Sequence, residues 1–206
     1  MPTSTFFNLP HQKQEKLICA IKEEFARVPF HEVSINKIVQ SAKIPRGSFY
    51  QYFEDKTDML KFILADYQQA MLDSAKKSLI ANNGDIFVMF TDVLAFTIDF
   101  VSEGQPHEFC KNLFSDISIN SSICSSMMNP HDFPKGVHPL IKYVNTDVLD
   151  IRSEEDFIGM IRIFFSIVGH AIAESFFDVS KCTLVKEVFA NNMELLKRGF
   201  LKNKEI

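Results

Sequence analysis

The sequence contains no tryptophan and few of the residues that interrupt helices, with 7 glycines and 8 prolines among its 206 residues. Apolar and polar residues nowhere alternate over a stretch long enough to predict a β-sheet. No apolar run reaches the roughly 20 residues that span a bilayer, because Arg162, His170 and Glu174 interrupt the longest candidate, residues 157–177. We therefore expect an all-α protein that does not cross a membrane.

Features of exported and metal-binding proteins are also scarce. The first residues show no basic segment followed by an apolar one, so we expect no export signal and a cytoplasmic location. The 4 cysteines form no C-x-x-C pair and are expected to be free thiols. The alternative is a zinc site that starts at His107 and Cys110 and continues with Cys124 and His131, but this spacing matches no common zinc pattern. We predict no bound metal and no cofactor.

The chain as a whole lacks the positive charge of a typical nucleic-acid-binding protein, since its formal net charge is −4. The charge is unevenly distributed, however. Residues 1–60 carry 8 basic and 7 acidic side chains, and the remainder carries 14 and 19. The segment 33–53 contains Lys37, Lys43 and Arg46 and no acidic residue. A locally positive surface on an acidic protein is compatible with DNA binding by one end of the molecule.

The spacing of apolar side chains predicts three short helices at the start of the chain, over residues 10–28, 34–41 and 45–53. Ser34 is placed to cap the second helix, and Pro45 suits the first turn of the third. A turn of only three residues separates these two helices. This arrangement is that of a helix-turn-helix, whose second helix enters the major groove of DNA.

The third of these helices carries the chemistry expected of a DNA-reading helix. Phe49 and Phe53 share its buried face. We expect the outer faces to carry Arg46, Ser48, Tyr50, Gln51 and Tyr52. Arg46 can pair with guanine or phosphate, Gln51 can pair with adenine, and hydroxyl groups can contact phosphate. Gly47 has no Cβ, so a phosphate can approach the backbone there. Taken alone, the pattern also fits an ordinary helical hairpin with a polar surface.

A longer motif narrows these alternatives. The run 42–60, AKIPRGSFYQYFEDKTDML, resembles the signature of the tetracycline-repressor (TetR) family. It has a short turn, then Gly-Ser/Thr-aromatic-Tyr-x-x-Phe, then Lys at the start of the next helix. The resemblance implies an N-terminal helix-turn-helix DNA-binding domain, residues 1–56, and a larger helical ligand-binding and dimerisation domain, residues 57–206. It also implies a non-enzymatic regulator, expected to be a repressor, that binds a near-palindromic operator as a homodimer and is released by a small apolar ligand.

The resemblance carries the DNA contacts of the family onto particular positions of this chain. These are Ser34, Asn36, Lys37, Arg46, Gly47, Ser48, Tyr50, Gln51, Tyr52 and Lys56. One departure concerns the turn, where the family usually has glycine and this chain has Lys43. If the turn requires a left-handed backbone there, lysine costs about 1 kcal/mol relative to glycine. Lys43 also brings a further cation near the phosphates, so we add it to the predicted DNA contacts.

The later helices are predicted over residues 55–80, 85–102, 154–177 and 181–202, with Asp55 as the cap of the first. Their interior is rich in phenylalanine and methionine, most of which is expected to be ordinary core. The resemblance implies an apolar ligand cavity among them, and the absence of clustered arginine or lysine favours an unphosphorylated ligand. The candidates for its lining are Tyr67, Met71, Phe90, Phe109, Phe114, Met127, Phe165 and His170.

The last two helices are the predicted dimer seam. The first presents mostly small side chains at helical spacing, which let another helix approach closely. These are Gly159, Ile163, Ser166, Gly169 and Ala173. The second presents an apolar stripe of Val185, Phe189, Met193 and Leu196. The resemblance implies that these helices pair in a symmetric four-helix bundle, with the same surface of both copies in contact.

Two other classes of protein are weighed against a regulator. A helical enzyme could use His170 and Glu174, four residues apart, as a proton-transfer pair, although a hydrogen bond along the helix explains the spacing equally well. The sequence contains no di-iron Glu-x-x-His pattern, phosphate loop or nucleophile elbow. A helical interaction protein that has lost DNA binding is the second alternative. The retention of Arg46, Tyr50 and Lys56 argues against it.

Overall fold

The computed structural model describes residues 2–104, 107–114 and 139–202. Within these ranges the chain is helical, and its only β-type pairing is an isolated antiparallel bridge between Leu149 and Leu201. The all-α prediction is therefore confirmed. Met127 and the cysteine and histidine at 124 and 131 lie outside the described residues.

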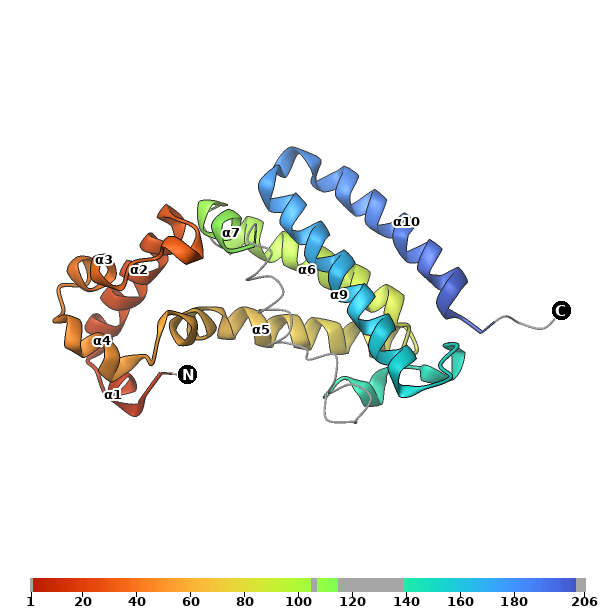
Figure 1. Ribbon diagram of the computed structural model, residues 1–206, viewed down its shortest axis with the longest axis horizontal. Coiled ribbons are helices and arrows are strands. Elements are labelled where there is room, and N and C mark those ends of the chain that lie inside the picture. Colours follow the sequence, from red (N-terminus) through yellow and green to blue (C-terminus); the bar gives the residue numbers. More distant parts are fainter. Residues whose placement is uncertain (1, 105–106, 115–138, 203–206) are drawn as a thin grey trace.

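The N-terminal helices form a small unit at one end of the molecule (Figure 1). The elements are α1 (Ser4–Phe7), α2 (His11–Arg27), α3 (Ile35–Ser41) and α4 (Arg46–Tyr52), with the 3₁₀ turn η1 (Phe30–Glu32) between α2 and α3. We refer to α1–α4 with η1 as the head. The three helices predicted here are confirmed to within about two residues at each end, whereas α1 was not predicted.

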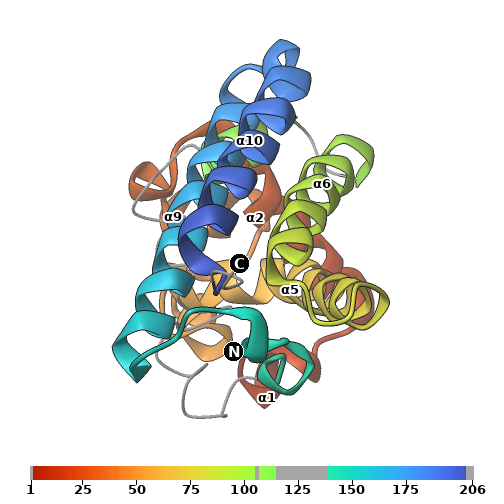
Figure 2. The same ribbon diagram turned by 90° about the vertical axis from the view of Figure 1, so that its right-hand side faces the viewer.

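Longer helices form the rest of the molecule, the body. They are α5 (Lys56–Ala81), α6 (Ile86–Gly104), α7 (His107–Phe114), α9 (Glu154–Phe177) and α10 (Cys182–Phe200). The 3₁₀ turns η3 (Ile141–Tyr143), η4 (Thr146–Val148) and η5 (Val179–Lys181) connect them. Figure 2 shows α6, α9 and α10 side by side, and α5 crossing beneath them. The short helix α7 packs against both α2 of the head and α9 of the body.

Local sequence signals explain where the long helices begin. The side chain of Asp55 accepts a hydrogen bond of 2.7 Å from the backbone N–H of Asp58, so the predicted cap of α5 is confirmed. At the start of α9, Ser153 and Asp156 form a reciprocal capping box. The acidic side chains in the first turn of α9 also interact favourably with the positive N-terminal end of the helix dipole. These caps fix the residues at which α5 and α9 begin.

A hydrophobic core runs without a break from the head into the body. Phe25 of α2 contacts Phe109 of α7 with ring centroids 6.0 Å apart. Phe53, directly after α4, contacts Phe62 of α5 at 5.8 Å. Within the body, Phe90 of α6 stacks on Phe164 of α9 at 4.6 Å. Movement of the head relative to the body therefore disturbs aromatic packing at two places, α7 and the start of α5.

Helix α9 is, among the described helices, the one that is long and apolar enough to cross a membrane. Nine of its residues are instead buried against neighbouring helices. They are Phe157, Met160, Ile161, Phe164, Val168, Ala171, Ile172, Ser175 and Phe176. Packing against neighbouring helices thus accounts for one face of α9, which contributes to the core of the body.

Candidate DNA-binding surface

The turn between α3 and α4 has a specific backbone geometry. The N–H of Ile44 donates to the carbonyl of Val39 at 3.0 Å, and the N–H of Lys43 donates to the carbonyl of Gln40 at 3.2 Å. This pair of bonds is the Schellman motif, which ends a helix with one residue in the left-handed conformation. That residue is Lys43, with φ of 56°. The condition raised for this turn is therefore met: Lys43 adopts the left-handed conformation at the position where the family usually has glycine.

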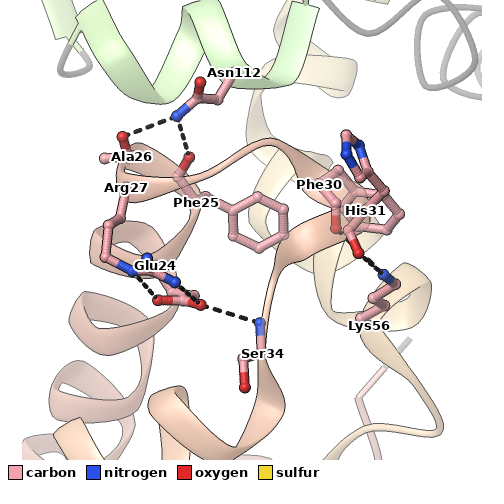
Figure 3. Close-up of polar contacts among 9 residues, drawn as sticks. All are labelled: Glu24, Phe25, Ala26, Arg27, Phe30, His31, Ser34, Lys56 and Asn112. Atoms are coloured by element: carbon pink, nitrogen blue, oxygen red, sulfur yellow. Dashed lines mark hydrogen bonds and ion pairs between the residues drawn. The ribbon is translucent and has the colours of Figure 1, made fainter.

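A buried carboxylate fixes the beginning of α3 relative to α2. Glu24 accepts two hydrogen bonds of 2.7 Å from the guanidinium of Arg27 and one of 3.0 Å from the backbone N–H of Ser34 (Figure 3). The hydrogen bonds from Arg27 hold the pKa of Glu24 below its usual value, against the opposing effect of burial. Ser34 is at the N-cap position, as predicted, but its side chain makes no capping bond. Glu24 satisfies an N-terminal N–H instead.

The predicted DNA contacts are concentrated on the outer side of α3 and α4. Exposed side chains or backbone are found at Asn36, Lys37, Lys43, Arg46, Gly47, Tyr50 and Gln51, and Ser34 and Ser48 are half-buried. A Cβ built on Gly47 meets no atom of the described residues within 4 Å, apart from those of its neighbours in α4. Packing within the chain therefore does not require glycine at this position. The free space beside Gly47 agrees with a close approach by an external group such as a phosphate.

The prediction that Tyr52 lies on an outer face is wrong. Its exposed fraction is 8%, and its ring contacts that of Phe6 at 6.3 Å. Tyr52 follows Phe49 by three residues, so both lie on one side of α4. The sequence pattern did not reveal α1, the helix that covers this side and buries Tyr52.

Lys56 and Asn112 connect the body to the head (Figure 3). The ammonium of Lys56, the first residue of α5, donates to the carbonyls of Phe30 at 3.3 Å and His31 at 3.1 Å, and it lies 4.9 Å from the centre of the Phe30 ring. Two of the three N–H groups of this ammonium thus bind η1. The contact of Lys56 with DNA stays a prediction, and the third N–H group is the one available for it.

Asn112 was not predicted, and no sequence signal marks it. From α7 its amide donates to the carbonyls of Phe25 at 3.1 Å and Ala26 at 2.9 Å, at the end of α2. These carbonyls belong to the last turn of α2, where helical partners are lacking. Asn112 therefore provides an attachment of the head to the body that is independent of α5.

The residues predicted to line a ligand cavity are mostly core residues. Tyr67, Met71, Phe90 and Phe109 are buried, and Phe165 is half-buried. The Tyr67 hydroxyl is 2.8 Å from that of Thr97, which itself donates to a backbone carbonyl of α6. The Phe114 side chain lies outside the described part of the structure. An open pocket of about 360 Å³ lies at the α5–α6 turn, and none of the predicted residues lines it.

The prediction that His170 lines an interior cavity is wrong. The exposed fraction of its side chain is 80%, and its Nε2 lies 4.0 Å from a carboxylate oxygen of Glu174 on the surface of α9. His170 lies in an apolar stretch of the sequence. Along the helix, however, it falls between the buried positions Val168 and Ala171 and points to the other side.

The predicted dimer seam is divided between the surface and the core. On α9, Ile163 and Ser166 are exposed and Gly159, Gly169 and Ala173 are half-buried. A Cβ built on Gly159 or Gly169 meets nothing within 4 Å among the described residues. On α10, the assignment of Val185, Phe189 and Met193 to the seam is wrong, because they are buried in the chain's own core. Leu196 also packs on this core. The exposed apolar side chains of α10 are instead Leu184, Val188 and Leu195.

The head thus has the architecture of a helix-turn-helix DNA-binding domain, in which a short helix bearing Arg46, Tyr50 and Gln51 is presented outward from a packed three-helix unit. Comparisons with known proteins agree with this class. Residues 17–63 match the model described as bacterial regulatory proteins, tetR family. Residues 85–200 match the tetracyclin repressor-like C-terminal domain. The chain belongs to the TetR family, and it is a transcription regulator rather than an enzyme.

Individual proteins that resemble this chain share only a modest fraction of its sequence. The HTH-type dhaKLM operon transcriptional activator DhaS of Lactococcus lactis is 32% identical over 63 residues, which cover 30% of this chain and 34% of that protein. The chain therefore matches about a third of that relative's length. A TetR family transcriptional regulator from Chloroflexus aurantiacus has a TM-score of 0.52 at 23% identity, covering 98% of this chain and all of that one. A regulator from Pectobacterium atrosepticum has a TM-score of 0.52 at 14% identity, with 96% of this chain covered and 100% of that chain. Both support the fold.

Replacing the left-handed residue of the turn is expected to stabilise the protein. Lys43→Gly should raise the free energy of unfolding by about 1 kcal/mol, because glycine adopts this conformation without the Cβ strain. Lys43→Ala is the matched control, since it removes the charge and keeps the Cβ. Both variants are compared with the wild type by denaturant unfolding. If Lys43→Ala stabilised the protein as much as Lys43→Gly, the gain would come from removal of the charge and not from relief of the backbone conformation.

Proposed function

We propose that the protein binds a near-palindromic DNA operator as a homodimer and is released from it by a small apolar ligand in the cytoplasm. In this proposal residues 1–56 form the DNA-binding domain and residues 57–206 bind the ligand and dimerise. The observation that carries the proposal is the outer surface of α3 and α4, where cationic, amide and hydroxyl groups surround an unobstructed Gly47. Such groups serve both the phosphate backbone and the base edges.

Repression is the proposed outcome of operator binding. A dimer that occupies a promoter can block transcription by binding DNA alone, without a surface that contacts another protein. The similarity of the chain to the activator DhaS supports activation as a second possibility, although it extends over 63 residues only. Deleting the gene and measuring transcripts of neighbouring genes distinguishes the two. Transcripts rise if the protein represses and fall if it activates.

Variants of α4 should separate contacts that position the protein from contacts that read the sequence. Arg46→Ala and Gln51→Ala are expected to change the preferred DNA sequence, because base-edge hydrogen bonds discriminate by about 1–3 kcal/mol for a good bidentate pair. Tyr50→Phe removes only a hydroxyl and should weaken binding to all sequences alike. In vitro selection of binding sites with each variant measures the preference, and titration at several salt concentrations measures the phosphate contribution. An unchanged preference in both Arg46→Ala and Gln51→Ala would place base reading elsewhere.

Dimerisation is proposed to use the exposed faces of α9 and α10. Ile163 on α9 and Leu184, Val188 and Leu195 on α10 are exposed apolar side chains, and the glycines of α9 allow a second copy to approach closely. A symmetric pairing of these two helices with those of a second copy buries both faces.

A charge placed in the middle of this surface should separate the subunits. Val188→Glu is expected to make the protein monomeric at micromolar concentration and to weaken operator binding at least tenfold, because a buried unpaired carboxylate is costly and the two heads are no longer linked. Ile80→Glu is the matched control, since Ile80 is an exposed apolar residue on α5, a helix that is not part of the proposed interface. Light scattering with size-exclusion chromatography gives the mass. A dimeric Val188→Glu protein would move the interface to another face.

Ligand binding in the body is proposed to reach the head along α5 and α7. Helix α5 joins Tyr67 and Met71, buried in the body, to Lys56 at η1, and α7 reaches α2 through Asn112. A tilt of either helix therefore shifts the head, and with it the separation of the two recognition helices in the dimer.

The coupling should be reciprocal. A compound that releases the protein from DNA, sought among aromatic and acyl-chain molecules, should bind the DNA-bound protein about 5- to 150-fold more weakly than the free protein. Calorimetric titration into both forms measures this ratio. Equal affinities would exclude that compound as the inducer. Asn112→Ala should reduce the ratio if α7 carries part of the coupling, and Gln69→Ala, an exposed change on α5, is the control.

A further inference from the structure

The segment before α2 is attached to the end of the recognition helix α4. The backbone N–H of Thr3 donates to the carbonyl of Tyr52 at 2.9 Å, and the hydroxyl of Thr3 donates to the carbonyl of Gln51. The match to the N-terminal family model begins only at residue 17, so the family assignment covers none of this segment. In Figure 1, α1 lies beside α4 at the lower edge of the head.

These two hydrogen bonds satisfy groups that a helix cannot satisfy by itself. The last carbonyls of any α-helix lack partners within the helix. In α4, the N–H of Phe53 bonds to the carbonyl of Phe49 at 2.9 Å. The carbonyls of Gln51 and Tyr52 come later, and Thr3 supplies a donor to each. The segment thus acts as a C-terminal cap that comes from a distant part of the sequence.

An aromatic side chain joins the same segment to both α4 and α5. Phe6 is 1% exposed, and its ring centroid lies 6.3 Å from that of Tyr52, 5.3 Å from that of Phe53 and 5.1 Å from that of Phe62. Tyr52 ends α4, Phe53 follows it, and Phe62 belongs to α5. Phe6 therefore fills the angle between the recognition helix and the helix that leads to the body.

The other end of the segment is held by α2. The amide of Gln14 donates to the carbonyl of Leu9 at 2.8 Å and to that of Phe7 at 3.2 Å. Because both ends are fixed, the segment cannot slide along α4 without breaking hydrogen bonds at α2 or at Thr3. It connects α2, α4 and α5, the three helices that determine how α4 is presented.

We propose that Thr3 and Phe6 are positioning residues for DNA recognition, which fix the angle of α4 so that its side chains meet the base edges. This inference rests on the proposed function. Hydrogen bonds to base edges require a defined helix orientation, whereas phosphate contacts by flexible lysine and arginine tolerate a change of angle. Loss of either residue should therefore reduce sequence discrimination more than it reduces non-specific binding.

The experiment compares binding to a duplex selected by the wild-type protein with binding to a scrambled duplex of the same length. Thr3→Val replaces the hydroxyl by a methyl group of similar size, and Phe6→Leu keeps an apolar side chain. Thr5→Val is the matched control, because Thr5 lies in the same segment and its side chain is exposed. Circular dichroism and light scattering are used to compare folding and mass at the temperature of the assay.

Discrimination is measured as the dissociation constant for the scrambled duplex divided by that for the selected duplex. This ratio is expected to fall by about threefold or more for Thr3→Val, which loses one hydrogen bond, and by about tenfold for Phe6→Leu, which loses part of a packed ring. Binding to the scrambled duplex should change less than twofold, as should the ratio of the Thr5→Val control. A purely stabilising role predicts lower melting temperatures with unchanged ratios in the folded protein, and that result overturns the inference. A wild-type protein that selects no sequence overturns the proposed function, and the positioning role with it.

Discussion

The buried carboxylate of Glu24 is the interaction on which the geometry of the helix-turn-helix depends. It lies on α2, binds the guanidinium of Arg27 on the same helix, and accepts the N–H of Ser34 at the start of α3. A carboxylate in this position is stable only while it remains paired, because burial without a partner is costly. The hydrogen bonds keep its pKa low, so it stays ionised and continues to anchor α3 at neutral pH. From this fixed start, the Schellman turn at Lys43 directs the chain into α4.

The orientation of α4 then depends on contacts made outside the motif itself. Phe6 and Thr3 hold its C-terminal end, and Phe53 packs against Phe62 of α5. Lys56 binds the η1 carbonyls, and Asn112 of α7 binds the end of α2. The head is therefore attached to the body at several points rather than by one flexible linker. This arrangement supports the proposed coupling, in which a change in helix packing within the body would reach the DNA-binding surface through rigid elements.

Errors in the predicted site share one physical origin. Helical spacing identifies which residues share a face, but not what that face packs against. Val185, Phe189 and Met193 do form the predicted stripe, yet the stripe faces the chain's own core. His170 lies in an apolar stretch and is nevertheless on the surface. Tyr52 was assigned to the outside because α1, a single turn without a strong sequence signal, was not foreseen.

Local signals in the sequence alone determined the all-α class, the bounds of the long helices and the cap at Asp55. Each of these depends on residues within a few positions of one another, so short-range spacing is sufficient to predict them. Only the tertiary structure decided that Glu24 binds the backbone N–H of Ser34 at the start of α3, that Asn112 connects α7 to α2, and that Thr3 caps α4. These contacts join residues 10, 86 and 48 positions apart in the sequence. Such pairs are created by the packing of whole helices, and no periodicity along the chain records them.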